Sequence, residues 1–261
     1  MRTTHAPSLA AALEPPDHGV LRAMTLNIVH GTRVSLPSSL FTRRFVLARL
    51  TRIAHAARAA GVDVLALQEA DGDARFDRSH AIARTAGLAT VIAPPREAQH
   101  GATLLARSPL APLSAHRFAA RRLDAKGFVL ARAATPDGHE IDVASIHLHV
   151  LSRRVRSRQI DAFAARVRDV HRDRGKRPLL VLGDLNDGFE GSARELADRL
   201  ELHTVDTDSP TYTDLGLRLR LDWVLASHEL EITQHRVLAP GLSDHRAIVA
   251  DVRVRRAGGA R

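Results

Sequence analysis

Short runs of hydrophobic residues along the chain end repeatedly in Asn, Asp, Glu or His. The clearest run spans residues 179–182 and is followed by Gly183 and then by three polar residues, Asp184, Asn186 and Asp187. Four consecutive apolar residues predict a strand buried on both faces, and the glycine predicts a sharp turn after it. Ligands of open α/β sheets gather at the carboxyl ends of strands. The segment therefore predicts a functional site, with an ordinary Asp/Asn-rich turn as the alternative.

The same pattern supplies five further groups of polar residues. Hydrophobic patterning predicts strands over residues 20–28, 62–69, 140–149, 219–225, 231–238 and 246–254. The polar residues in or beside these strands are Asn27, Glu69, His147, Asp222, and Asp244 with His245 between the last two strands. Glu69 is a candidate metal ligand because hard divalent cations prefer carboxylate oxygens. Asp222 interrupts an apolar run, where a carboxylate needs a partner. Each residue alone also fits a structural role, but their recurrence at six strand ends predicts one shared site.

Hydrophobic residues at helical spacing predict helices between these strands. The expected helices span 42–60, capped by Thr42; 74–86, ended by Gly87; a stretch that begins near 153 and runs past Val170; and 192–200, capped by Ser192. Residues 88–140 instead show short apolar runs separated by turn residues, which predict antiparallel strands. We expect one domain over 20–255, preceded by a flexible N-terminal arm (1–19) and followed by a frayed tail (256–261).

Composition narrows the class of protein. The 261 residues are 44% hydrophobic, which allows a sizeable core, but only 3% are aromatic. Cysteine is absent, which excludes disulfides, thiolate metal sites and cysteine nucleophiles and agrees with a reducing compartment. The chain shows neither the pattern of a secretory leader nor an apolar run long enough for a membrane span. We therefore expect a cytoplasmic, monomeric protein with no membrane span.

The formal net charge of +9 indicates an anionic partner, such as a nucleic acid, a phosphorylated metabolite or an acidic lipid surface. Only two of the 38 basic residues are lysines, and such a bias toward arginine is also what GC-rich coding produces. Both interpretations stay open. One basic cluster near a turn comprises Arg117, Arg121, Arg122 and Lys126. A solvated loop is favoured there over a phosphate site.

A histidine pair ends the strand expected over 140–149. Alternation along a strand places His147 and His149 on one face, and Arg153 and Arg154 follow at the start of the next helix. Together they predict contacts with a phosphate group of a substrate. The alternative for His149 is a structural role, which is commoner for a lone histidine.

The polar strand ends occur in an order that resembles a known family. The ordered motifs are Leu26-Asn27, Leu67-Gln68-Glu69, His147-Leu148, Gly183-Asp184-Leu185-Asn186, Asp222-Trp223 and Ser243-Asp244-His245. They resemble the endonuclease/exonuclease/phosphatase superfamily, which includes deoxyribonuclease I, apurinic endonucleases, inositol-polyphosphate 5-phosphatases and bacterial sphingomyelinases. The resemblance implies the α/β fold of deoxyribonuclease I, a four-layer α/β sandwich of two mixed β-sheets packed face to face with helices on the outside. It also implies Mg²⁺- or Mn²⁺-dependent cleavage of a phosphoester.

The resemblance further implies roles for individual residues. Glu69, assisted by Asn27, would hold the cation, and Asp244 would lie on the metal side. Asp184 would orient or deprotonate the attacking water.

The remaining motif residues would act on the phosphate. Asn186 and His147 would donate hydrogen bonds to the phosphoryl oxygens. His245 would contact the phosphate or move a proton, with Asp222 as its expected partner. Which aspartate serves His245 stays open at this point.

Two features depart from the family pattern. Val29 stands where apurinic endonucleases carry an acidic residue, and the scarcity of aromatic residues removes stacking platforms for bases. The expected function is divalent-metal-dependent hydrolysis of a phosphodiester or phosphomonoester, with a phosphoester as the partner molecule. The alternatives are a sequence-nonspecific nuclease of the same fold and a catalytically inactive basic protein that binds polyanions or nucleic acid.

Overall fold

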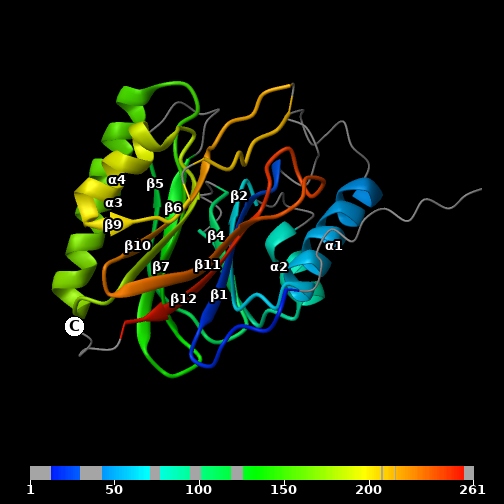
Figure 1. Ribbon diagram of the computed structural model, residues 1–261, viewed down its shortest axis with the longest axis horizontal. Coiled ribbons are helices and arrows are strands. Elements are labelled where there is room, and N and C mark those ends of the chain that lie inside the picture. Colours follow the sequence, from blue (N-terminus) through cyan, green and yellow to red (C-terminus); the bar gives the residue numbers. More distant parts are fainter. Residues whose placement is uncertain are drawn as a thin grey trace, which may run out of the picture.

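Two six-stranded β-sheets lie at the centre of the computed structural model, with helices on either side (Figure 1). The structure describes residues 13–29, 43–70, 77–94, 101–118, 126–206, 208–214 and 216–255. Most of the expected N-terminal arm, the Thr42 cap and the expected tail lie outside these residues. The domain limits therefore stay a prediction.

The first sheet has the strand order β11-β12-β1-β2-β4-β3. Its strands are β1 (Leu21–Asn27), β2 (Val64–Gln68), β3 (Thr90–Ile92), β4 (Thr103–Ala106), β11 (Leu230–Val237) and β12 (Ile248–Val254). β1 and β2 run parallel, and the other neighbours run antiparallel. The sheet is therefore mixed, with its parallel pair in the middle.

The second sheet has the order β5-β6-β7-β8-β10-β9. Its strands are β5 (Ala111–Arg117), β6 (Gly127–Ala134), β7 (Glu140–His147), β8 (Leu179–Asp184), β9 (Leu202–His203) and β10 (Asp222–Ser227). Here β7 and β8 are the parallel pair in a mixed sheet. Each sheet thus has two central parallel strands whose carboxyl ends reach the same edge.

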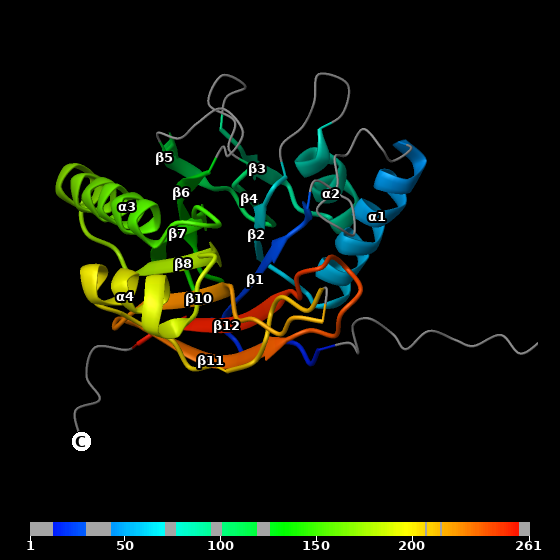
Figure 2. The same cartoon turned by 90° about the horizontal axis from the view of Figure 1, so that it is seen from above.

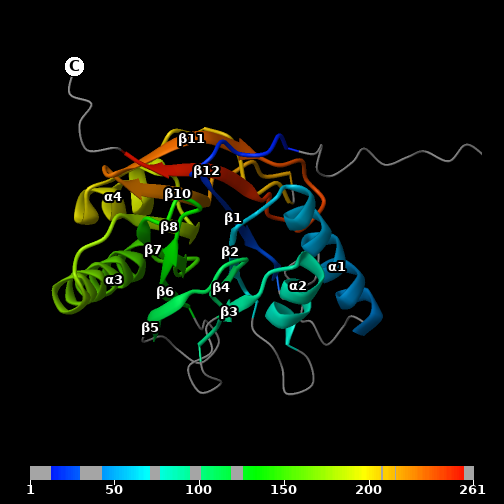
Figure 3. The ribbon, with the colours of Figure 1, turned by 90° about the horizontal axis from the view of Figure 1, so that it is seen from below.

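Helices cover the outer face of each sheet. α1 (Arg43–Ala59) and α2 (Arg78–Ala86) lie against the first sheet. α3 (Arg153–Arg174) and α4 (Arg194–Leu200), which follows a π-helical segment η4 (Phe189–Ala193), lie against the second. Figures 2 and 3 show the two helix pairs on opposite sides of the sheets. The expected four-layer α/β sandwich is confirmed. None of the helices in the described ranges has the length and apolar character that crossing a membrane requires.

Alternation along the strands divides the core into three hydrophobic layers. In β8, Leu180 and Leu182 pack between the two sheets, and Leu179 and Val181 pack with α3 and α4. The prediction that this strand is buried on both faces is confirmed. Burial of each leucine contributes roughly 1.5–3 kcal/mol, so well-packed strands carry the polar residues at their ends.

Three strand ends near the site differ from the prediction. β10 begins at Asp222, three residues later than predicted. β8 continues through Gly183 to Asp184, so the glycine is not a turn residue. β7 ends at His147, two residues earlier than predicted. The chain leaves the sheet there because the backbone N–H of His149 donates to Gln159 Oε1 of α3 instead of to a strand.

Two further details differ near α4. Ser192 does not cap a helix as predicted; it lies inside η4, where its Oγ donates to Asp187 Oδ2. The short strand β9 was not predicted, because two residues are too few to show a period of two. Asp187 also accepts from Arg156, so it ties η4 to α3.

Candidate active site

Six strands bring polar residues to one edge of the two sheets. Four do so at their carboxyl ends: β1, β2, β7 and β8 supply Asn27, Glu69, His147 and Asp184. β10 runs antiparallel to β8 and β12 antiparallel to β1, so Asp222 and the Asp244-His245 pair lie at the amino-terminal ends of their strands. The predicted convergence occurs, but the assumption that every strand contributes its carboxyl end is wrong for these two.

Asp184 lies at the centre of this edge, next to His147 and Asp222 in the strand pairing. Its Oδ2 accepts from Asn27 Nδ2 at 3.0 Å, and its Oδ1 accepts from the backbone N–H of Asn186 at 2.9 Å. Burial, together with the negative charge of Asp222, raises the pKa of Asp184 to about 6. A base with a pKa near neutrality is suited to accept a proton from water.

Gly183 allows β8 to approach β7 closely just before Asp184. A Cβ atom at this position would lie 2.0 Å from the backbone oxygen of Ile146, the residue paired with Gly183. No side chain fits there. The glycine is therefore required by the spacing of the two strands that carry His147 and Asp184.

Asp222 and His245 form a buried ion pair. Asp222 Oδ2 lies 2.8 Å from His245 Nδ1. Burial alone would lower the pKa of His245, but the charges of Asp222 and Asp184 outweigh it and raise the pKa to about 10. The imidazole is thus protonated at neutral pH, with Nε2 3.9 Å from Asp184 Oδ2. Of the candidate aspartates, Asp222 is the one that contacts the ring.

Two residues that the sequence did not single out support this pair. Thr211 Oγ1 accepts from the backbone N–H groups of Leu221 and Asp222, at 3.0 Å each, and fixes the start of β10. The Tyr212 ring lies edge-on to His245 with centroids 5.2 Å apart. Nothing in the local sequence marks Thr211 or Tyr212, because their partners come from other strands.

Glu69 follows β2 in a left-handed backbone conformation, with φ of 55°. Gly101 makes room for it: a Cβ on Gly101 would lie 2.8 Å from Glu69 Cα. Glu69 Oε1 accepts from Asn27 Nδ2 at 3.4 Å. Its side chain is 21% exposed, against 1% for Asp184, so Glu69 is more accessible from solvent.

Lys126 belongs to the same cluster, and its assignment to a solvated loop is wrong. The residue is buried, and its Nζ lies 3.4 Å from Glu69 Oε1 and 3.4 Å from His147 Nδ1. His147 Nε2 in turn lies 3.4 Å from Asp184 Oδ2. The one available signal was that this lysine lies two residues before the hydrophobic run that begins at Phe128. Of the other residues in the predicted basic cluster, Arg121 and Arg122 lie outside the described residues.

Asn186 and Asp244 complete the set. Asn186 Nδ2 donates to the backbone oxygen of Leu148 at 2.9 Å, and the same amide nitrogen carries a second N–H that can bond a ligand. Asp244 is buried, with Oδ1 accepting from Ser243 Oγ at 3.0 Å. Burial raises the pKa of Asp244, and the negative charge of Glu69 adds to the rise. Asp244 and Glu69 are therefore close enough to repel each other.

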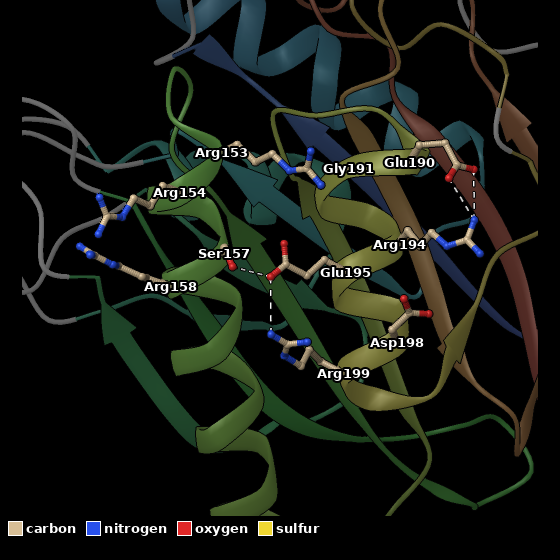
Figure 4. A pocket seen from close by; sticks show the side chains of 10 residues that line it. All are labelled: Arg153, Arg154, Ser157, Arg158, Glu190, Gly191, Arg194, Glu195, Asp198 and Arg199. Atoms are coloured by element: carbon tan, nitrogen blue, oxygen red, sulfur yellow. Dashed lines mark hydrogen bonds and ion pairs between the residues drawn. The ribbon is translucent and has the colours of Figure 1, made fainter.

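The three residues expected to contact substrate lie around the loop into α3. His149 Nδ1 accepts from the backbone N–H groups of Leu151 and Ser152, so the ring shapes this loop. Arg153 and Arg154 are exposed and line an open hollow of about 660 Å³ between α3, η4 and α4 (Figure 4). In the described part of the chain, no hydrogen bond or ion pair joins Arg153 or Arg154 to the cluster at the sheet edge.

The arginines around this hollow differ in their pairing. Arg194 and Arg199 are paired with Glu190 and Glu195, which lie on the same helical wall. Arg153, Arg154 and Arg158 make no ion pair with any residue that the structure describes. In Figure 4, Arg154 and Arg158 point to the same side of α3, and Arg153 points across toward η4. This arginine group leaves positive charge available to an anion.

The oxygens at the sheet edge fit a hard divalent cation, because carboxylate and amide oxygens are the ligands that Mg²⁺ and Mn²⁺ prefer. Asp184, Asp222 and His245 offer ligand atoms within 4.8 Å of one another. In that group the protonated His245 ring already supplies a positive charge. The mutually repelling Glu69 and Asp244, with Asn27 beside Glu69, fit a cation better.

Comparison with known proteins identifies the family. A model of the Endonuclease/Exonuclease/phosphatase family matches residues 25–245. Among curated protein sequences, none matches this chain.

Solved structures share the fold. An endonuclease/exonuclease/phosphatase from Bacteroides vulgatus is 15% identical, with a TM-score of 0.71 over 90% of this chain and 99% of that one. The human nocturnin catalytic domain with bound sulfate is 21% identical, with a TM-score of 0.66 over 91% and 96%. Sphingomyelinase C from Streptomyces griseocarneus is 17% identical, with a TM-score of 0.65 over 89% and 99%.

The family match begins before the first-strand Asn27 and ends at His245. It therefore includes every strand end that contributes to the cluster. On this match, the chain belongs to the endonuclease/exonuclease/phosphatase family.

Proposed function

We propose that the protein is a divalent-metal-dependent phosphoesterase that hydrolyses a phosphodiester or phosphomonoester by metal-assisted attack of water. The observation that carries the proposal is the pairing of a base with a proton-bearing donor. Asp184 has a pKa of about 6, and the protonated His245 lies beside it with Nε2 3.9 Å from Oδ2. Membership of a family that acts on phosphoester bonds supports the same reaction class.

Glu69 and Asp244, with Asn27, would hold the cation through their side-chain oxygens. When bound, Mg²⁺ or Mn²⁺ polarises a phosphoryl oxygen and stabilises charge on the leaving group.

Asp184 accepts the proton of the attacking water in this proposal. Its two oxygens are held by Asn27 and by the backbone of Asn186, so the carboxylate keeps one orientation. A fixed base close to its substrate avoids the entropy loss of finding that geometry during the reaction. The raised pKa makes Asp184 a stronger base than an exposed aspartate.

Three donors act on the phosphate. His147 and Asn186 donate to the phosphoryl oxygens as negative charge builds on them. His245 contacts the phosphate through Nε2–H, the end of the ring that faces away from Asp222. His149 shapes the loop, while Arg153 and Arg154 contact parts of the substrate that lie outside the reacting centre.

A sequence-nonspecific nuclease is the second candidate within this reaction class. The observation that favours it is the group Arg153, Arg154 and Arg158 on α3, which has no acidic partner among the described residues, in a chain of net charge +9. Arginines that neutralise successive backbone phosphates give binding without sequence preference. An inactive polyanion-binding protein is the candidate from another class. Its difficulty is that the acidic cluster at the sheet edge would repel a polyanion.

A substrate panel distinguishes these candidate functions. The purified protein is incubated with plasmid DNA, with RNA and with two small esters, bis(para-nitrophenyl) phosphate and para-nitrophenyl phosphate. The proposal expects turnover of at least one substrate with Mg²⁺ or Mn²⁺ and none with excess EDTA. Turnover of small esters alone rules out the nuclease. DNA binding that is alike in the wild type and Asp184→Asn, with no turnover of any substrate, rules out the enzyme.

A further inference from the structure

Lys126 reaches into the candidate active site from the start of β6. Its Nζ lies 3.4 Å from both His147 Nδ1 and Glu69 Oε1. The next residue, Gly127, is the backbone partner of His147 in the pairing of β6 with β7. The backbone oxygen of Lys126 also accepts from Phe118 at 2.9 Å. The position of the lysine relative to the His147 ring is therefore set by the sheet.

The burial of this lysine calls for a physical reason. An ammonium group taken out of water loses hydration that only close partners restore. The side chain of Lys126 is 9% exposed, whereas the chain's other lysine, Lys176, is 68% exposed beside Glu229. Glu69 and His147, two residues with roles in the proposed reaction, are partners that restore part of this hydration.

The contact with His147 fixes the position of the ring proton. An ammonium group has three donors and no acceptor, so Nδ1 must be the accepting nitrogen. The N–H of a neutral imidazole then lies on Nε2. Nε2 is the nitrogen that faces Asp184, 3.4 Å from its Oδ2. The Lys126 and His147 contact is long for a hydrogen bond, as catalytic contacts often are before a substrate binds.

We propose that Lys126 is a positioning residue that holds His147 in the tautomer with its proton on Nε2, so that an N–H and not a lone pair faces the phosphoryl group. The catalytic consequence rests on the proposed function, but the tautomer does not. The same ammonium group holds Glu69 Oε1. Lys126 thus joins the metal-side residue of the first sheet to the phosphate-side residue of the second.

Loss of the ammonium group should affect the chemical step more than substrate binding. In the other tautomer, a lone pair on Nε2 would face the carboxylate of Asp184 and the phosphoryl oxygens. Partners that orient a functional histidine typically contribute about 10- to 100-fold to activity. We expect Lys126→Met to lower kcat by that factor with a smaller change in KM. Lys126→Arg, which keeps the donor, should recover part of the loss, and the matched control Lys176→Met should behave like the wild type.

The tautomer can be observed without activity, by long-range proton–nitrogen NMR of the metal-free full chain labelled with nitrogen-15 in its histidines. His147→Gln identifies the His147 signals by their loss. The expected result is an unprotonated Nδ1 and a protonated Nε2 in the wild type, Lys126→Arg and Lys176→Met. Lys126→Met should show a mixture of tautomers.

A wild-type proton on Nδ1 overturns the inference. So does a folded Lys126→Met variant that keeps the wild-type tautomer. If Lys126→Met does not fold, the wild-type and Lys126→Arg spectra decide: a proton on Nε2 in both supports the inference, and one on Nδ1 in either overturns it. Lack of turnover by the wild type counts against the proposed function alone, because these spectra do not depend on turnover.

Discussion

Asp222 Oδ2 and His245 Nδ1 lie 2.8 Å apart, although the two residues come from the starts of strands in different sheets. The strand pairing places Asp222 beside Asp184, and the Asp222 contact turns the far side of the imidazole toward that second carboxylate. The pair therefore fixes both the orientation and the charge of His245. Replacing Asp222 should therefore change the orientation and the charge of the His245 ring while the ring itself stays in place.

Asp222→Asn tests this relationship. We expect kcat/KM to fall by about 100- to 10,000-fold, because an amide neither holds the protonated imidazole nor fixes its proton. The pKa of His245 should fall as well, since the charge of Asp222 raises it. Steady-state kinetics and an NMR titration of His245 measure the two effects. Asp161→Asn, which removes an exposed partner of Arg199, is the matched control. A wild-type rate in Asp222→Asn would show that the pair has no catalytic role.

Asp184 should titrate near pH 6 in the metal-free protein, well above its ordinary value of 3.8. Burial and the charge of Asp222 penalise the ionised form, so the carboxylate appears only as the pH rises through about 6. Because the folded pKa exceeds the unfolded one, this group favours folding at low pH, and that contribution is lost between about pH 4 and 6. Carbon-13 NMR of the carboxyl group measures the midpoint. Between these two pH values, the free energy of unfolding should fall less for Asp184→Asn than for the wild type. A titration midpoint near 3.8 would contradict the raised pKa of Asp184.

Gly183→Ala should destabilise the protein by at least about 2 kcal/mol, because the added Cβ meets the backbone oxygen of Ile146 and neither strand can move away cheaply. Chemical denaturation measures the free energy of unfolding. Gly188→Ala is the control, since a Cβ there meets no atom within 4 Å. We expect that variant to stay within about 0.5 kcal/mol of the wild type. Equal stability of the two variants would contradict the spacing argument.

The exposed arginines at the start of α3 should matter for polyanions and not for small esters. Replacing Arg154 and Arg158 with alanine removes two cations that point to one side of the helix (Figure 4). If each neutralises one phosphate, the slope of log affinity against log salt for a DNA duplex should fall by about 2. Fluorescence anisotropy in EDTA measures this slope without cleavage. The control is a double variant on α1 in the opposite layer, Arg52→Ala with Arg58→Ala. If the slope changes equally in both double variants, the arginines of α3 do not contact DNA locally.

The sequence predicted the site residues that directly follow a hydrophobic run on the same strand. A hydrophobic run followed by an acid or amide marks Asn27, Glu69 and Asp184, because one strand carries both the signal and the residue. The directions of β10 and β12 could not be predicted this way, since strand direction follows from pairing with distant segments.

Residues whose environment comes from elsewhere in the chain were missed or misplaced. Lys126 is buried beside Glu69 and His147, which lie 57 and 21 positions away in the sequence. A single lysine in a sequence predicts an exposed side chain, so this burial was missed. His149 was placed on the strand by alternation, but Gln159 of α3 draws its backbone out of the sheet. Periodicity reports what one element prefers, and these two residues depend on contacts between elements.

In the proposed reaction, Asp184 acts as the base and a divalent cation is required. The most direct test is the rate of phosphoester hydrolysis by wild type and Asp184→Asn, each with Mg²⁺, with Mn²⁺ and with EDTA, on the best substrate of the panel. We expect turnover by the wild type only with a cation, and a rate at least about 100-fold lower for Asp184→Asn, which should remain folded. Turnover by the wild type that persists in EDTA, or that Asp184→Asn matches, would contradict this mechanism.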